Sequence, residues 1–147
     1  MDLSELENYF GERLITSESV REQHSHDESW HIPENIPDAV IFPETTEEIS
    51  KIMTYASDNN IPVVPFGAGT ALEGHVHAVN GGITINSINM NKIIEVNLED
   101  MDCRVQAGVT REDLNTFLRD TGLFFPVDPG ANASIGGMCS TGASGTN

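Results

Sequence analysis

The sequence predicts an α+β domain whose first half has α/β character. Residues 38–65 hold two short apolar runs on either side of an amphipathic segment, which is typical of a strand–helix–strand unit with parallel strands. Residues 82–107 hold three more short runs separated by turn residues, and the later ones resemble a hairpin. A length of 147 residues leaves room for one domain.

The chain begins with a predicted helix over residues 2–15. Its apolar residues recur three or four positions apart, at Leu3, Leu6, Phe10 and Leu14. Residues 21–37 are polar and interrupted by proline, so they predict a loop. We expect Trp30 to anchor this loop by packing.

The next elements form the strand–helix–strand unit. Residues 38–42 predict a buried strand, and Thr45 with Glu48 has the spacing of a capping box that opens a helix. The helix is expected to end at Asn59-Asn60, and residues 61–65 predict the second strand. The expected buried face of the helix is Ile49, Ile52, Met53 and Ala56.

Further strands are predicted over residues 82–86, within 90–96 after a turn, and over 102–107. Thr110 is expected to cap a helix over residues 111–121, with Gly122 as the glycine that follows its end. The expected buried face of this helix is Leu114, Phe117 and Leu118.

The charge excludes two classes of partner. The chain carries 23 Asp and Glu against 7 Lys and Arg, a net charge of −16. Nucleic acids and anionic membranes are bound through Lys and Arg, so neither is expected as a partner. No apolar run approaches a membrane span, and the acidic N-terminus lacks the features of a signal peptide. We expect a cytoplasmic protein in which Cys103 and Cys139 are reduced thiols.

Ten of the 13 glycines lie in residues 67–82 and 130–145. The first window follows a predicted strand, and its backbone N–H groups could form a nest for phosphate oxygens, although a plain turn would have the same composition. It is neither a P-loop nor a Rossmann fingerprint, because no Gly-Lys-Ser/Thr follows and Leu72 replaces the third glycine. The second window could be a flexible linker, but Ile135 and Met138 favour an ordered segment.

Four linked motifs carry a family resemblance: PFGAGTALEG, MNKIIEVN, VQAGVTREDLNTFLRDTGLFFPVDPG and ASIGGMCSTGASGTN. Together they resemble the PCMH-type FAD-binding domain of the vanillyl-alcohol-oxidase/p-cresol-methylhydroxylase superfamily, and within it D-lactate dehydrogenases and glycolate oxidase flavoprotein subunits. The resemblance implies an FAD-linked enzyme that oxidises a 2-hydroxy acid to the 2-keto acid and passes electrons to an acceptor.

The resemblance also implies roles for individual residues. Gly67 to Leu72 would hold the FAD pyrophosphate, Asp128 to Ser134 would line the flavin end, and Thr141 to Ser144 would return to the phosphates and ribityl chain. It implies no catalytic residue and no metal ligand in this chain. The implied cofactor-binding residues are Gly67, Ala68, Gly69, Thr70, Ala71, Leu72, Asp128, Pro129, Gly130, Ser134, Gly136, Gly137, Thr141, Gly142, Ala143 and Ser144.

The sequence departs from the family pattern at several positions. Thr70 stands where members with covalent flavin often have histidine, so we expect non-covalent FAD. His26 stands where relatives commonly have arginine before Asp-Glu-Ser, and relatives have other residues at His75 and His77. The pair at His75 and His77 has the spacing of half a metal site, but without a third ligand we favour a solvent-exposed loop.

The resemblance divides the chain into an N-terminal helix and polar loop, residues 1–37, and the N-terminal part of an FAD-binding domain, residues 38–147. We expect a truncated domain, with the substrate-binding cap domain absent and no turnover by this chain alone. Two alternatives remain open. The chain could be a non-catalytic remnant that folds without FAD and self-associates, or the enzyme could be an oxidase acting on another alcohol.

Overall fold

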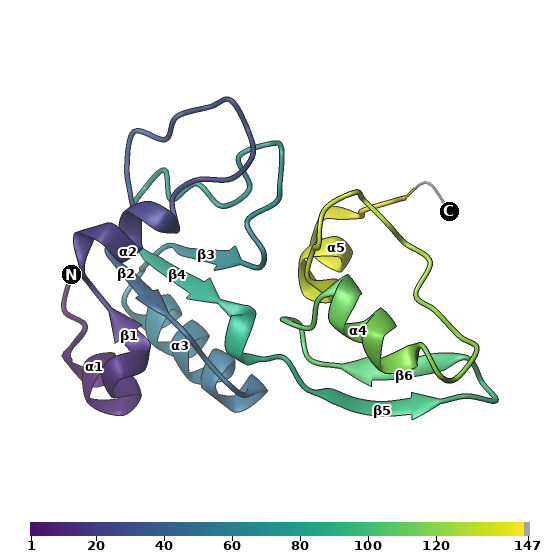
Figure 1. Cartoon of the computed structure of the whole chain (residues 1–147). Coiled ribbons are helices and arrows are strands. Elements are labelled where there is room, and N and C mark those ends of the chain that lie inside the picture. Colours follow the sequence, from purple (N-terminus) through teal and green to yellow (C-terminus); the bar gives the residue numbers. More distant parts are fainter. Residues whose placement is uncertain (146–147) are drawn as a thin grey trace.

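The computed structural model describes residues 1–145 and contains a four-stranded sheet and a two-stranded sheet, each with its own helices (Figure 1). The predicted α+β class is therefore confirmed. The helices are α1 (Ser4–Phe10), α2 (Glu18–Gln23), α3 (Thr46–Asp58), α4 (Arg111–Leu118) and α5 (Ile135–Thr141). The strands are β1 (Leu14–Ile15), β2 (Ala39–Ile41), β3 (Val63–Phe66), β4 (Ile83–Asn86), β5 (Ile93–Asn97) and β6 (Asp102–Val105).

The larger sheet has the strand order β1-β2-β4-β3. Strands β2, β4 and β3 run parallel, and β1 is antiparallel at one edge. The predicted parallel unit is confirmed, with β4 inserted between β2 and β3. This arrangement leaves β3 at the other edge, so the glycine-rich segment that follows Phe66 leaves the sheet at its rim (Figure 1).

The predicted helix over residues 2–15 is too long. Gly11 adopts φ +55°, which ends α1, and the chain then forms a short 3-10 helix and strand β1. The apolar spacing was still informative, because Leu6 and Phe10 are buried in one cluster with Ile52 and Ile83. The N-terminal segment thus contributes to the core beneath the larger sheet.

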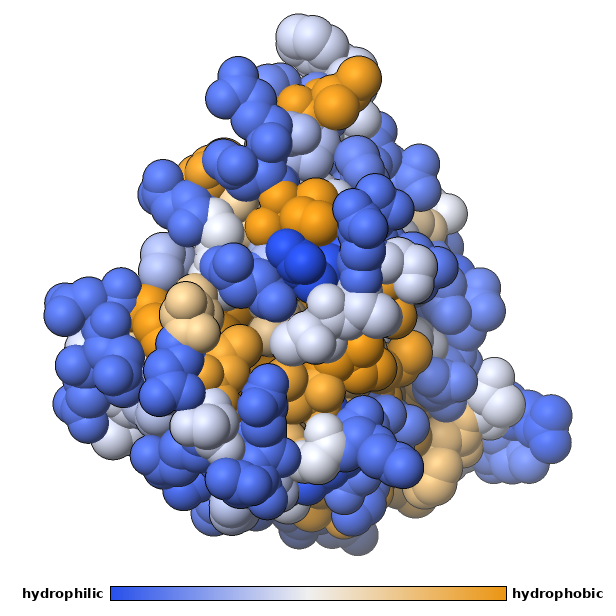
Figure 2. All heavy atoms as spheres, turned by 90° about the vertical axis from the view of Figure 1, so that its left-hand side faces the viewer, coloured by the Kyte–Doolittle hydropathy of each residue, from blue (hydrophilic) through white to orange (hydrophobic). Residues whose placement is uncertain are grey.

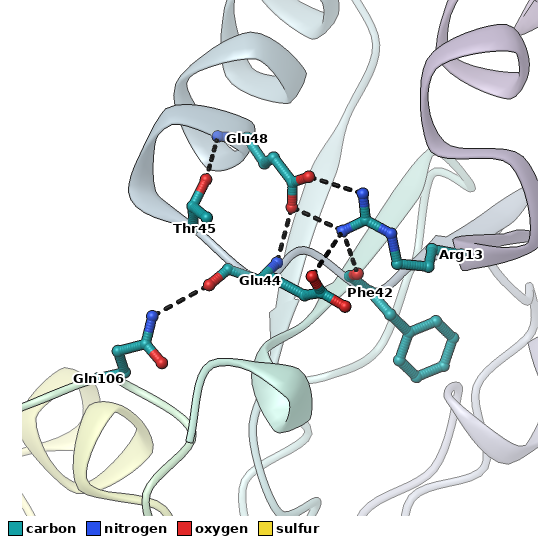
Figure 3. Close-up of polar contacts among 6 residues, drawn as sticks. All are labelled: Arg13, Phe42, Glu44, Thr45, Glu48 and Gln106. Atoms are coloured by element: carbon teal, nitrogen blue, oxygen red, sulfur yellow. Dashed lines mark hydrogen bonds and ion pairs between the residues drawn. The ribbon is translucent and has the colours of Figure 1, made fainter. Parts of the chain in front are cut away.

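Helix α3 begins at the predicted cap, since Thr45 Oγ1 accepts a hydrogen bond from Glu48 N at 3.2 Å. The Glu48 carboxylate does not close a capping box on Thr45. It accepts a hydrogen bond from Glu44 N at 2.7 Å and two from the Arg13 guanidinium at 2.6 and 2.7 Å (Figure 3). Met53, predicted to be buried, is 46% exposed, because the core contacts of α3 are made through Ile52 and Ala56.

The Arg13–Glu48 pair predicts an acid-dependent stability. Hydrogen bonds from Arg13 are the largest cause that lowers the pKa of Glu48 in the folded protein. A folded-state pKa below the unfolded one stabilises the protein above about pH 4.3, and this contribution is lost as pH falls through the folded pKa. We expect Glu48→Gln to lower the free energy of unfolding by about 2 kcal/mol near pH 7 and to reduce its decline on acidification.

The measurement is urea unfolding from pH 7 down to pH 3. Glu47→Gln is the matched control, because Glu47 is its exposed neighbour and the Glu47 side chain has no hydrogen-bond or ion-pair partner among residues 1–145. Equal acid slopes for the unchanged protein and Glu48→Gln would contradict the prediction.

The smaller sheet is the predicted hairpin, with β5 antiparallel to β6. Helix α4 begins at the predicted cap, where Thr110 Oγ1 accepts a hydrogen bond from Asp113 N at 3.2 Å. Leu114 and Leu118 are buried against this sheet, as predicted. Phe117 is 58% exposed and the prediction for it was wrong, because three residues after Leu114 it lies at the edge of the buried face of α4.

The second glycine window is ordered, as its apolar residues predicted, and it contains a helix, α5, that the sequence did not predict. Ser134 caps α5 by accepting a hydrogen bond from Gly137 N at 3.2 Å, and Met138 is buried. The last residues of the TGASGTN motif, Thr146 and Asn147, lie outside the described residues.

The surface is mainly polar on the side that carries α1 and α2, where Figure 2 shows hydrophilic side chains around smaller apolar areas. Trp30 is 92% exposed, so its expected role as a packing anchor is wrong.

No helix within residues 1–145 has the length and apolar character needed to cross a membrane. The helix α2 occupies the start of the segment predicted to be loop, and residues 24–38 are irregular.

Candidate cofactor-binding site

The loop after β3 presents unused backbone N–H groups. Among residues 1–145, the N–H groups of Ala68 to Leu72 donate no hydrogen bond to another residue. Gly69 adopts φ +70°, a conformation that glycine reaches without strain. A residue outside the loop also holds it in place, since Glu28 N donates a hydrogen bond to Ala71 O at 2.9 Å. Consecutive free N–H groups in a turn are a common means of binding phosphate oxygens.

The two glycine windows meet at Gly67. A Cβ atom at this position would overlap the Ser134 Oγ atom and would lie 3.9 Å from the Gly137 Cα atom. Gly67 therefore packs directly on the first turn of α5, although these residues are far apart in the sequence. This contact joins the free N–H groups of the first window to the second window in one site.

Helix α5 is fixed from its other side by the segment after β6. Ile135 N donates to Val109 O at 2.8 Å, and Gly136 N donates to Ala107 O at 2.9 Å. A Cβ atom at Gly136 would overlap Ala107, so this glycine permits close packing between two backbones. Its predicted contact with cofactor remains a prediction, whereas its packing role is visible.

Three of the predicted flavin-end residues, Asp128, Pro129 and Gly130, form one wall of an open hollow. Asp128 Oδ1 accepts a hydrogen bond from Gly130 N at 3.0 Å, which closes a tight turn around Pro129. Gly145 packs on the backbone of Asp128, where a Cβ atom would not fit. The hollow is lined by Asp128, Pro129, Gly130, Ser144 and Gly145.

Thr141 and Gly142 lie at the end of α5, and Ala143 follows it. Thr141 Oγ1 donates to Gly137 O at 3.0 Å, so its hydroxyl hydrogen is already engaged within the helix. Gly142 adopts the left-handed conformation that ends α5, and Ala143 N donates to Met138 O. Leu72 is exposed and Thr70 is half-buried. None of these contacts tests cofactor binding, which stays a prediction for each residue.

Arg111 lies at this site but is not among the residues predicted from the sequence. Its Nη1 atom lies 3.2 Å from Asp128 Oδ2, and its backbone N donates to Ala133 O at 3.0 Å. The sequence does contain one indication of such a partner, because residues 121–147 hold a single acid, Asp128, and no base. The counter-ion of Asp128 therefore had to come from another segment.

The histidines differ from the expectation of an exposed loop. His75 is exposed, but His77 is buried and its Nε2 atom lies 3.4 Å from Asp27 Oδ1. Burial acts to raise the pKa of Asp27, but hydrogen bonds from Ser29 and the nearby His77 outweigh it and lower the pKa. No group of three or more His, Cys, Asp or Glu able to hold a metal is found in residues 1–145.

Comparison with known proteins finds one matching family and several relatives. Residues 37–147 match the family described as "FAD binding domain". The chain is 48% identical over 136 residues to "Probable D-lactate dehydrogenase, mitochondrial" of Danio rerio, covering 92% of this chain and 27% of that protein. It is 41% identical over 145 residues to "D-lactate dehydrogenase [cytochrome], mitochondrial" of Arabidopsis thaliana, covering 98% and 26%.

A third relative is glycolate oxidase subunit GlcD of Bacillus subtilis, 38% identical over 114 residues, with 76% of this chain and 24% of that protein covered. The chain thus spans about a quarter of the length of these relatives. Among solved structures, an alkyldihydroxyacetonephosphate synthase superposes with a TM-score of 0.88 at 24% identity, covering 97% of this chain and 32% of the other. That likeness concerns the fold.

Proposed function

This chain belongs to the FAD-binding domain family, and from that premise we propose that it binds FAD without a covalent bond and supplies the first part of the cofactor site of an FAD-linked oxidoreductase. The observation that carries the proposal is the contact of Gly67 with Ser134 beside the free N–H groups of Ala68 to Leu72. A dinucleotide with two phosphates suits a loop whose donors are backbone N–H groups and which contains no lysine or arginine.

The residues present fit this cofactor. Gly67 to Leu72 would hold phosphate oxygens through backbone N–H groups, and Asp128 to Gly130 would line a neighbouring part of the cofactor. Thr70 carries no ring nitrogen that could attach flavin covalently. When bound, FAD supplies the acceptor for a hydride.

For the substrate, we propose a 2-hydroxy acid of the D-lactate or glycolate type. Oxidation to the 2-keto acid removes a hydride from the α-carbon and a proton from the hydroxyl group, and the electrons then pass to a separate acceptor. The names of the relatives support this proposal, since they include D-lactate dehydrogenases and a glycolate oxidase subunit. A cytoplasmic location also remains a proposal.

The proposed cofactor is tested by mixing the purified chain with FAD and desalting the mixture. We expect a yellow chromophore to elute with the protein, or a saturable rise in flavin fluorescence anisotropy if binding is too weak to survive desalting. Lumichrome is the matched control ligand, because it keeps a fused ring system but lacks the phosphates. Absence of saturable FAD binding would overturn the proposal for this chain.

The proposed substrate is tested with the enzyme that carries this domain, under anaerobic conditions. We expect the flavin absorbance to bleach on addition of D-lactate or glycolate, and the preferred acid to bleach it at lower concentration. L-lactate is the control of matched size and charge. Bleaching by neither 2-hydroxy acid would contradict the substrate proposal and would leave the cofactor proposal standing.

A further inference from the structure

Asp128 is the one acid in residues 121–147, and it lies on the wall of the hollow beside Ser144 and Gly145. Its side chain is 30% exposed, so it is partly shielded from water. An uncompensated carboxylate at this place would repel an anionic dinucleotide. The site therefore needs a positive charge near Asp128 if it is to admit such a ligand.

Arg111 is placed to supply that charge. Its Nη1 atom lies 3.2 Å from Asp128 Oδ2, while its Nη2 atom is 3.9 Å from Glu112, and its side chain is 22% exposed. The Nε atom is buried and has no hydrogen-bond partner within residues 1–145. Of its two acidic partners, Asp128 is therefore the nearer to the guanidinium, at 3.2 Å against 3.9 Å for Glu112. None of the other six Lys and Arg side chains forms an ion pair with residues 128–145.

The backbone around Arg111 is tied to the same segment. Arg111 N donates to Ala133 O at 3.0 Å, and Glu112 N donates to Asn132 Oδ1 at 3.1 Å. Thr110 pairs with Ser134, whose hydroxyl packs against Gly67. The guanidinium therefore has a fixed position relative to the segment that bears Asp128 and leads into α5.

We propose that Arg111 is a positioning residue for FAD, acting as the counter-ion that neutralises and orients Asp128 on the wall of the cofactor site. This inference rests on the proposed function. Its role is indirect, because Arg111 acts on the carboxylate, which otherwise would oppose the phosphates. A direct contact between Arg111 and the cofactor is not part of the proposal.

The test is a double-substitution cycle in the full chain, with FAD affinity measured by flavin fluorescence anisotropy. We expect Arg111→Gln to weaken FAD binding about tenfold, because it leaves a partly buried carboxylate unpaired beside an anionic ligand. Asp128→Asn keeps the oxygen that accepts from Gly130 N and removes the charge, so in this background the loss of Arg111 should weaken FAD binding by less than about threefold. The double variant Arg111→Gln/Asp128→Asn should therefore bind FAD more tightly than Arg111→Gln alone, and this recovery is measured against Asp128→Asn.

Two further measurements separate the counter-ion role from a structural one. Arg111→Lys should retain most of the affinity, and the penalty of Arg111→Gln should shrink as salt is raised, because the effect is electrostatic. Arg119→Gln is the matched control, since Arg119 is exposed and pairs weakly with Asp120. It should leave affinity unchanged.

The outcomes are distinct. No recovery in the double variant would overturn the inference and would indicate either a direct contact with FAD or a folding defect, which urea unfolding of Arg111→Gln identifies. Equal affinity of the unchanged chain and Arg111→Gln would also overturn it, while leaving the proposed function intact. If the unchanged chain binds no FAD, the proposed function of this chain fails and the inference fails with it.

Discussion

Gly67→Ala is expected to weaken FAD binding by about tenfold to a hundredfold, since steric overlap costs about 1–3 kcal/mol and each 1.4 kcal/mol is a factor of ten. The added Cβ atom would overlap the Ser134 hydroxyl, which is buried and caps α5. Either α5 loses its cap, or the loop of free N–H groups moves away from the second window. Both responses separate the two halves of the proposed site.

A second substitution identifies the cause. Ser134→Ala removes the overlapping oxygen, so Gly67→Ala/Ser134→Ala should bind FAD more tightly than Gly67→Ala, although it lacks the cap. Gly122→Ala is the control for stability alone, because Gly122 has φ +80° and open space around its Cβ position and is not one of the predicted cofactor-binding residues. We expect it to cost about 1 kcal/mol of stability and no affinity. An affinity of Gly67→Ala equal to that of Gly122→Ala would refute the role assigned to this contact.

The second large effect concerns stability. We expect Leu6→Ala to lower the free energy of unfolding by about 3 kcal/mol, because Leu6 is fully buried and its truncation leaves a cavity. The helix that carries it packs into the same cluster as Ile52 of α3 and Ile83 of β4. Loss of this side chain should therefore destabilise the larger sheet as a whole.

Met53→Ala is the matched control, because Met53 lies on α3 beside Ile52 but is nearly half exposed. Its cost should be below about 1 kcal/mol. Urea unfolding followed by circular dichroism measures both variants. Similar losses for Leu6→Ala and Met53→Ala would mean that α1 is not part of the folding core.

Local chemistry in the sequence determined much of this protein. Thr45 and Thr110 cap their helices because a cap depends on residues within one turn, and the two parallel strands and the hairpin follow from short apolar runs and turn residues. The four motifs led to the FAD-binding family, which residues 37–147 confirm. Each of these features is encoded in neighbouring residues, so the sequence alone reveals it.

The tertiary structure decided what depends on distant partners. Met53 and Phe117 fit an apolar spacing but face solvent, because the side of a helix that is buried depends on where the sheet lies. Glu48 bonds to Arg13 and not to its own cap, and Asp128 finds its counter-ion on α4. The two glycine windows are visible in the sequence, but the contact between them is not. Only the packing of Gly67 on Ser134 brings them together into the candidate site, because a contact between backbones remote in sequence leaves no periodic pattern.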